Sequence, residues 1–163
     1  MQGFNRVIIM KRKKIGDVFS ISTSNGFRLV QYIGDDETGF PIIRIISGFF
    51  ESSKITDEEI ESSKTEYFLK FLIYLTEHRK MAEYVGNYFV PSHVSKPTVY
   101  RSESMPSVSG EWHWCTVENR DNITGKRVGK ITSEFLALSP WGTWSFPLFQ
   151  KRLEKGWKLT DWK

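Results

Sequence analysis

Several features of secreted and membrane proteins are scarce in this chain of 163 residues. It has one cysteine, so no intramolecular disulfide can form, which fits a reducing compartment. The longest apolar run near the N-terminus is Val7–Met10, which is too short for a signal-peptide core. No apolar run approaches the roughly 20 residues of a membrane span. We therefore expect a soluble, cytoplasmic protein that does not bind membranes.

Motifs that mark catalytic or cofactor sites are also missing. No P-loop, G-x-G-x-x-G or G-x-S-x-G pattern occurs, and no CxxC or HExxH pair suggests a metal. The candidate ligands and nucleophiles are His78, His93, His113 and Cys115. Only His113 and Cys115 share one face of an expected strand, whereas zinc normally takes three or four ligands. We expect no metal and no cofactor, and a hydrolase is the least favoured function.

Charge is distributed unevenly along the chain. The net charge is +4, less than a dedicated nucleic-acid binder would carry. Basic residues gather in Lys11–Lys14 and in the C-terminal third, whereas acids gather in Asp35–Glu37 and Asp57–Glu61. The basic run could contact phosphate, but a solvated approach to the next strand is the simpler interpretation. Separated patches of opposite sign favour a protein partner at least as well as a polyanion.

The stretch from residue 15 to residue 50 has the pattern of three strands and two turns. Asn25-Gly26 suits a type I′ hairpin turn, in which both central residues need positive φ. A polar turn at Gly34–Gly39 precedes a third, isoleucine-rich strand at Pro41–Ile46. This meander could start a small SH3-like barrel. The aromatic content of 15% also favours strand-rich packing.

The remaining chain alternates short elements. Thr56 and Glu59 form a capping-box pattern at the start of a helix. Residues 66–76 fit either a buried strand, which we favour, or part of a helix over 57–80. Ser145, Pro147 and Gly156 delimit a final helix. Further strands are expected at residues 6–10, 88–90, 98–101, 112–117 and 126–131, with a turn at 119–125. The whole predicts a single α+β domain over residues 1–163, mostly antiparallel, with one or two short helices.

Some of these residues resemble a known family. The basic lead-in Lys11–Lys14 followed by Gly16–Ile21, the segment Gly86–Pro91 with Pro97, and the C-terminal Glu134–Leu136 and Gly156 are similar to the immunity protein 26 family. Such proteins are encoded beside bacterial polymorphic toxins, including those of contact-dependent growth inhibition. The resemblance implies a non-catalytic protein that binds its cognate toxin domain stoichiometrically and blocks it.

A basic toxin would be attracted to the acidic patches, because immunity proteins often cover basic active sites with carboxylates. A second candidate surface is the Trp141–Trp144 pair, although core packing is the favoured interpretation there. The expected binding residues are therefore Asp35, Asp36, Glu37, Asp57, Glu58, Glu61, Trp141 and Trp144. The alternative function is an SH3-like or Tudor-like nucleic-acid-binding module, for which a steep salt dependence of binding would be diagnostic.

Overall fold

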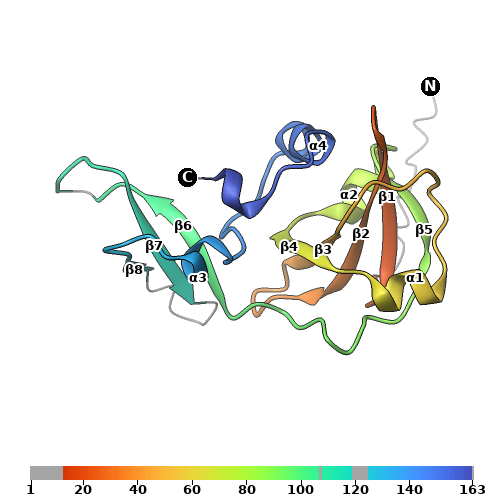
Figure 1. Ribbon diagram of the computed structural model, residues 1–163, viewed down its shortest axis with the longest axis horizontal. Coiled ribbons are helices and arrows are strands. Elements are labelled where there is room, and N and C mark those ends of the chain that lie inside the picture. Colours follow the sequence, from red (N-terminus) through yellow and green to blue (C-terminus); the bar gives the residue numbers. More distant parts are fainter. Residues whose placement is uncertain (1–12, 107, 119–124, 163) are drawn as a thin grey trace, which may run out of the picture.

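Two antiparallel β-sheets lie side by side in the computed structural model, which describes residues 13–106, 108–118 and 125–162 (Figure 1). The larger sheet has the strand order β4-β3-β2-β1-β5 and the smaller one β6-β7-β8. The strands are β1 (Asp17–Thr23), β2 (Gly26–Asp35), β3 (Pro41–Ile46), β4 (Thr65–Lys70), β5 (Glu83–Asn87), β6 (Val99–Ser104), β7 (His113–Glu118) and β8 (Gly125–Arg127). The helices are α1 (Asp57–Ser62), α2 (Ile73–His78), α3 (Ser133–Leu136), α4 (Phe146–Glu154) and the 3₁₀ helix η1 (Leu159–Asp161).

The predicted α+β class with mostly antiparallel strands is confirmed. In the described part of the chain the larger sheet does not close into a barrel, because β4 and β5 remain its two edges. The SH3-like form is therefore not confirmed. The helices outnumber the one or two that were expected. The strand expected at residues 6–10 and most of the turn at 119–125 lie outside the described residues.

The first hairpin forms where it was predicted, but its turn differs. Thr23 pairs with Gly26, so Ser24 and Asn25 form the loop. Among the described non-glycine residues only Lys80 has positive φ, which excludes a type I′ turn at Asn25-Gly26. Gly26 itself has a φ of 117° and ends the loop. Its missing side chain is needed, because a Cβ there would lie 2.6 Å from the Phe50 carbonyl oxygen.

The prediction of a single strand over residues 66–76 is wrong for the second half of that range. Strand β4 ends at Lys70, and α2 begins at Ile73. The break follows from the partner strand: Lys70 pairs with Ile42, and the Phe71 amide donates to the carbonyl of Pro41, where β3 begins. The expected strand at residues 88–90 is also misplaced, because β5 ends at Asn87.

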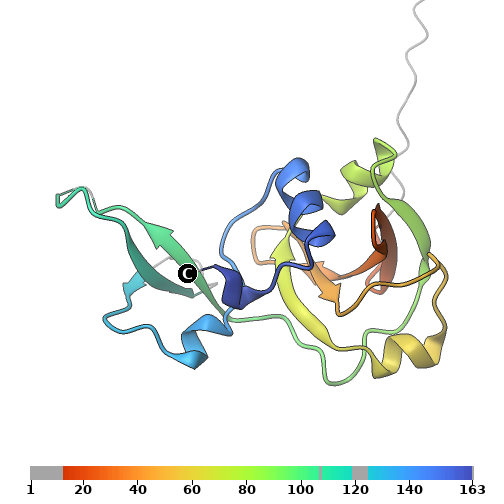
Figure 2. The ribbon, with the colours of Figure 1, turned by 45° about the horizontal axis from the view of Figure 1, so that its top comes forward.

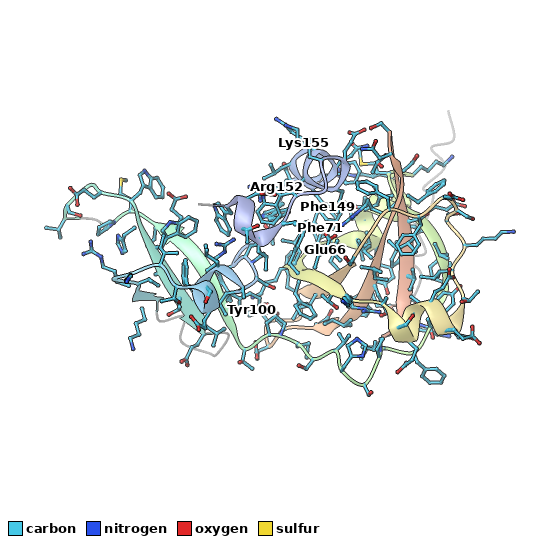
Figure 3. The ribbon with its side chains drawn as sticks, viewed as in Figure 1. Glu66, Phe71, Tyr100, Phe149, Arg152 and Lys155 are labelled. Atoms are coloured by element: carbon cyan, nitrogen blue, oxygen red, sulfur yellow. The ribbon has the colours of Figure 1, made fainter. Side chains whose placement is uncertain are left out.

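Both faces of the larger sheet are buried. One face packs against α2 and α4; there the rings of Phe71 and Phe149 lie 4.3 Å apart between α4 and the sheet (Figure 3). The other face packs against Ile55 and Ile60, the latter from α1. Burial on two faces explains why β3 is an almost continuous apolar run.

The segment from residue 139 to residue 143 joins the two sheets. Pro140 forms a parallel bridge with Arg101 of β6, and Thr143 forms one with Lys70 of β4. Trp141 packs edge-on against Tyr100 of β6. Arg101 is fully buried and donates to the carbonyls of Leu159 and Trp162, so the C-terminal segment is fixed to the smaller sheet.

Candidate partner-binding groove

A groove of about 470 Å³ lies between α1 and the chain that leaves β5. It is lined by Asp57, Glu58, Ile60, Glu61, Ser62 and Phe89. Figures 1 and 2 both show the segment after β5 passing close to α1 on its way to β6. The groove therefore brings three of the predicted binding carboxylates together with an aromatic ring.

The wall that carries the carboxylates is a short, well-capped helix. The Thr56 hydroxyl accepts from the Glu59 amide at 3.2 Å, and the Glu59 carboxylate accepts from the Thr56 amide at 2.7 Å. This confirms the predicted capping box. Ile60 is buried against the sheet. Asp57, Glu58 and Glu61 flank this contact on the same helix and are exposed.

The opposite wall is fixed to both ends of this helix. The Tyr88 hydroxyl donates to the carbonyl of Ile55 at 3.0 Å, just before α1. The His93 Nε2 lies 3.2 Å from the carbonyl of Ser63, just after α1. Between these two contacts, Phe89 projects outwards with 89% of its surface exposed. An exposed aromatic ring held by a fixed backbone is suited to anchor a partner, because little conformational freedom is lost on binding.

A buried polar network underlies the groove and connects its walls. The Gln31 amide donates to the carbonyl oxygen of Phe89 at 3.2 Å and accepts from the Arg44 Nε at 2.8 Å. The Arg44 Nη2 donates to the Ser63 hydroxyl at 2.9 Å. Gln31 and Arg44 are both fully buried. The positions of α1 and Phe89 are thus coupled through two side chains that no partner would touch.

Arg44 has no carboxylate partner within ion-pair distance among the described residues. Burial lowers the pKa of Arg44 to about 10, and the nearby negative charge of Glu61 partly offsets that effect. The guanidinium therefore remains charged at neutral pH.

The second acidic patch, Asp35–Glu37, is largely used by the fold. Asp36 forms a 2.8 Å ion pair with Lys70 and accepts from the amides of Thr38 and Phe40. Burial alone would raise the pKa of Asp36, but these hydrogen bonds outweigh it and hold the pKa well below its usual range. Its side chain is only 2% exposed, so the predicted binding role does not fit Asp36. Asp35 pairs with Lys13, and Glu37 is exposed.

Trp141 and Trp144 are half-buried and pack against the chain's own side chains. The Lys70 ammonium lies 3.7 Å from the ring centroid of Trp141. Trp144 packs against Tyr67, Phe149 and Trp157. Both rings therefore have the packing role that the sequence favoured, and neither lines the groove.

The histidines and the cysteine do not assemble into a site. Among residues 13–106, 108–118 and 125–162, no group of three or more His, Cys, Asp or Glu is placed to hold a metal ion. Cys115 is buried, with its Sγ 3.5 Å from the Ser102 carbonyl. His93 alone contributes to the groove, through its contact with Ser63.

Sequence reasoning missed Phe89, Gln31 and Arg44. Phe89 was assigned to a strand, in which alternate side chains would be covered, and its exposure depends on contacts with α1. Gln31 and Arg44 lie on strands that were predicted, but neither residue was given a role. A glutamine and an arginine within otherwise apolar strands were the available signals of a buried polar network.

Comparison with known proteins adds no relative: no family model, curated protein or solved structure matches the chain. No helix in the described part of the chain is long and apolar enough to cross a membrane.

Proposed function

We propose that this chain is a toxin-neutralising immunity protein that binds a basic toxin domain stoichiometrically through the groove between α1 and Phe89. The observation that carries the proposal is an almost fully exposed phenylalanine beside Asp57, Glu58 and Glu61, on walls fixed by hydrogen bonds. The sequence resemblance to the immunity protein 26 family supports the same function.

The composition of the groove suits a basic partner. Carboxylates at the rim attract cationic side chains and accelerate association, whereas an apolar anchor at the centre slows dissociation. The chain as a whole carries +4, so this local negative surface is opposite in sign to the net charge. A toxin acting on nucleic acid, whose active site is basic, would be covered and blocked by such a surface.

The proposal predicts that a toxin domain is encoded beside this gene, and that domain is the partner to test. Isothermal titration calorimetry should give one-to-one binding, and co-expression should protect cells from the toxin. Phe89→Ala should weaken binding by at least about 2 kcal/mol, as expected of a hot-spot aromatic residue. The matched control is Trp112→Ala, which removes another exposed aromatic ring, from the loop before β7. Equal affinities for wild type and Phe89→Ala would place the interface elsewhere.

A nucleic-acid-binding module is the second candidate. It is favoured by the exposed Trp112 before β7 and the exposed Lys126 and Arg127 on β8. Binding to DNA or RNA of any sequence, with an affinity that falls steeply with salt, would support it over toxin binding.

A further inference from the structure

A second groove, here named the α2–α4 groove, lies on the other face of the larger sheet. Leu72, Leu75 and Met81 line it from the start of α2, from α2 itself and from the turn after it. Trp144 and Phe146 line it from the start of α4. Figures 1 and 2 both show α2 and α4 side by side over this sheet. The three side chains from the α2 region are 36–45% exposed, which is high for apolar residues gathered at one place.

The size of the α2–α4 groove indicates what it accommodates. Its volume is about 170 Å³, below the roughly 300–1,000 Å³ of pockets that enclose a drug-sized ligand. It therefore fits the apolar anchor side chains of a protein segment better than a free small molecule. Met81 adds adaptability, since a thioether side chain fills irregular gaps.

The electrostatics of the groove specify the charge of the partner. Arg79 is the only charged residue that lines it, and no carboxylate does. Arg79 is exposed and forms no ion pair within the described residues. A carboxylate on the partner would therefore meet an available guanidinium and no opposing acid.

The groove does not offer a strand edge to its partner. No residue of the edge strand β5 lines it. At the other edge, β4 is covered at Lys70 by the bridge to Thr143. We propose that the α2–α4 groove binds an amphipathic helix of a second protein, with apolar anchors on one face and a carboxylate that pairs with Arg79. This proposal is independent of toxin binding at the groove between α1 and Phe89, here named the α1 groove.

Two synthetic helical peptides test the proposal. Both carry leucines at positions i, i+4 and i+7; one has glutamates beside them and the other has lysines. Fluorescence anisotropy at low salt should show that wild type prefers the glutamate peptide by about tenfold, and that Arg79→Glu reverses the preference. Leu75→Ser should weaken both peptides, and the Met81 methyl resonance should shift when the glutamate peptide binds. Melting temperatures of both variants verify folding.

Lys130→Glu is the matched control, because it reverses an exposed charge outside the groove and should leave the preference unchanged. The proposal is overturned if neither peptide binds wild type, if both bind equally, or if folded Leu75→Ser binds as well as wild type. It is equally overturned if Lys130→Glu abolishes the preference as Arg79→Glu does.

Discussion

The Lys70 ammonium lies 3.7 Å from the ring centroid of Trp141 and 2.8 Å from the Asp36 carboxylate, so one cation links the larger sheet to the segment that leads from the smaller one. Two further cations make cation–π contacts: Arg101 lies over Trp114 and Trp162, and Arg152 lies over Trp144 and Trp157. These rings contact the chain's own cations. They are therefore occupied, which weighs against a Tudor-like aromatic cage that would receive a cation from outside.

Replacing Asp36 by asparagine should destabilise the fold in a pH-dependent way. The pKa of Asp36 is depressed in the folded state, so its stabilising effect is present above its unfolded pKa of about 3.9 and is lost as the pH falls through the folded value. We expect a loss of about 3 kcal/mol at pH 7, because the buried Lys70 ammonium would lose the carboxylate that it contacts at 2.8 Å. Urea unfolding of both proteins should show that the difference narrows below about pH 4. A difference that stays constant from pH 3 to pH 7 would contradict this account of Asp36.

Gly26→Val should destabilise the first hairpin by about 2 to 4 kcal/mol. The residue has positive φ, and a side chain would collide with the backbone of Phe50. Gly129→Val is the control, because that glycine has ordinary φ and no neighbour within 4 Å. Equal melting temperatures for Gly26→Val and wild type would show that the turn is built differently.

Lys80→Gly should stabilise the protein by about 1 kcal/mol. Lys80 follows Arg79, the C-cap of α2, and has a φ of 59°, a conformation that glycine adopts without steric cost. The Met81 amide donates to the Thr76 carbonyl at 2.9 Å, which closes the helix end and requires that conformation. Thermal unfolding should show a higher midpoint for the variant. A lower midpoint would mean that the lysine side chain stabilises the fold by more than its positive φ destabilises it.

Substitution of His78, His113 or Cys115 should leave toxin protection intact, because none of them lines the α1 groove. Protection is measured as survival of cells that express the toxin together with each variant. His93 is a separate case, since its ring contacts the Ser63 carbonyl at the end of α1. Loss of protection by a folded, toxin-binding His113 or Cys115 variant would indicate catalysis.

Local signals predicted the elements that depend on neighbouring residues. The capping box at Thr56, the final helix with Pro147 in its first turn, and the glycine stop at Gly156 are all present. Each of these features depends on residues within a few positions of one another. Sequence reasoning therefore had the necessary information at these points.

The errors arose where distant residues decide the structure. The Phe50 carbonyl accepts from the Phe27 amide and approaches Gly26, which fixes the conformation of the hairpin turn. Strand β4 ends because its partner β3 begins at Pro41. The α1 groove depends on Gln31 and Arg44, which are remote in sequence from Phe89. A single sequence places the acids of α1 on one helix face, but it does not place an aromatic ring beside them.

In the proposed function, Asp57, Glu58 and Glu61 attract a basic toxin domain to the α1 groove. Stopped-flow association with that domain tests it most directly. Lysine at all three positions should lower the association rate at least about tenfold at low salt, with a smaller loss at high salt. The control replaces the exposed Glu103, Glu111 and Glu118 by lysine, which changes the net charge equally but on the smaller sheet and the loop between β6 and β7. It should slow association much less. The proposed interface is wrong if the groove variant associates as fast as wild type at low salt. It is also wrong if the control variant is slowed as much as the groove variant.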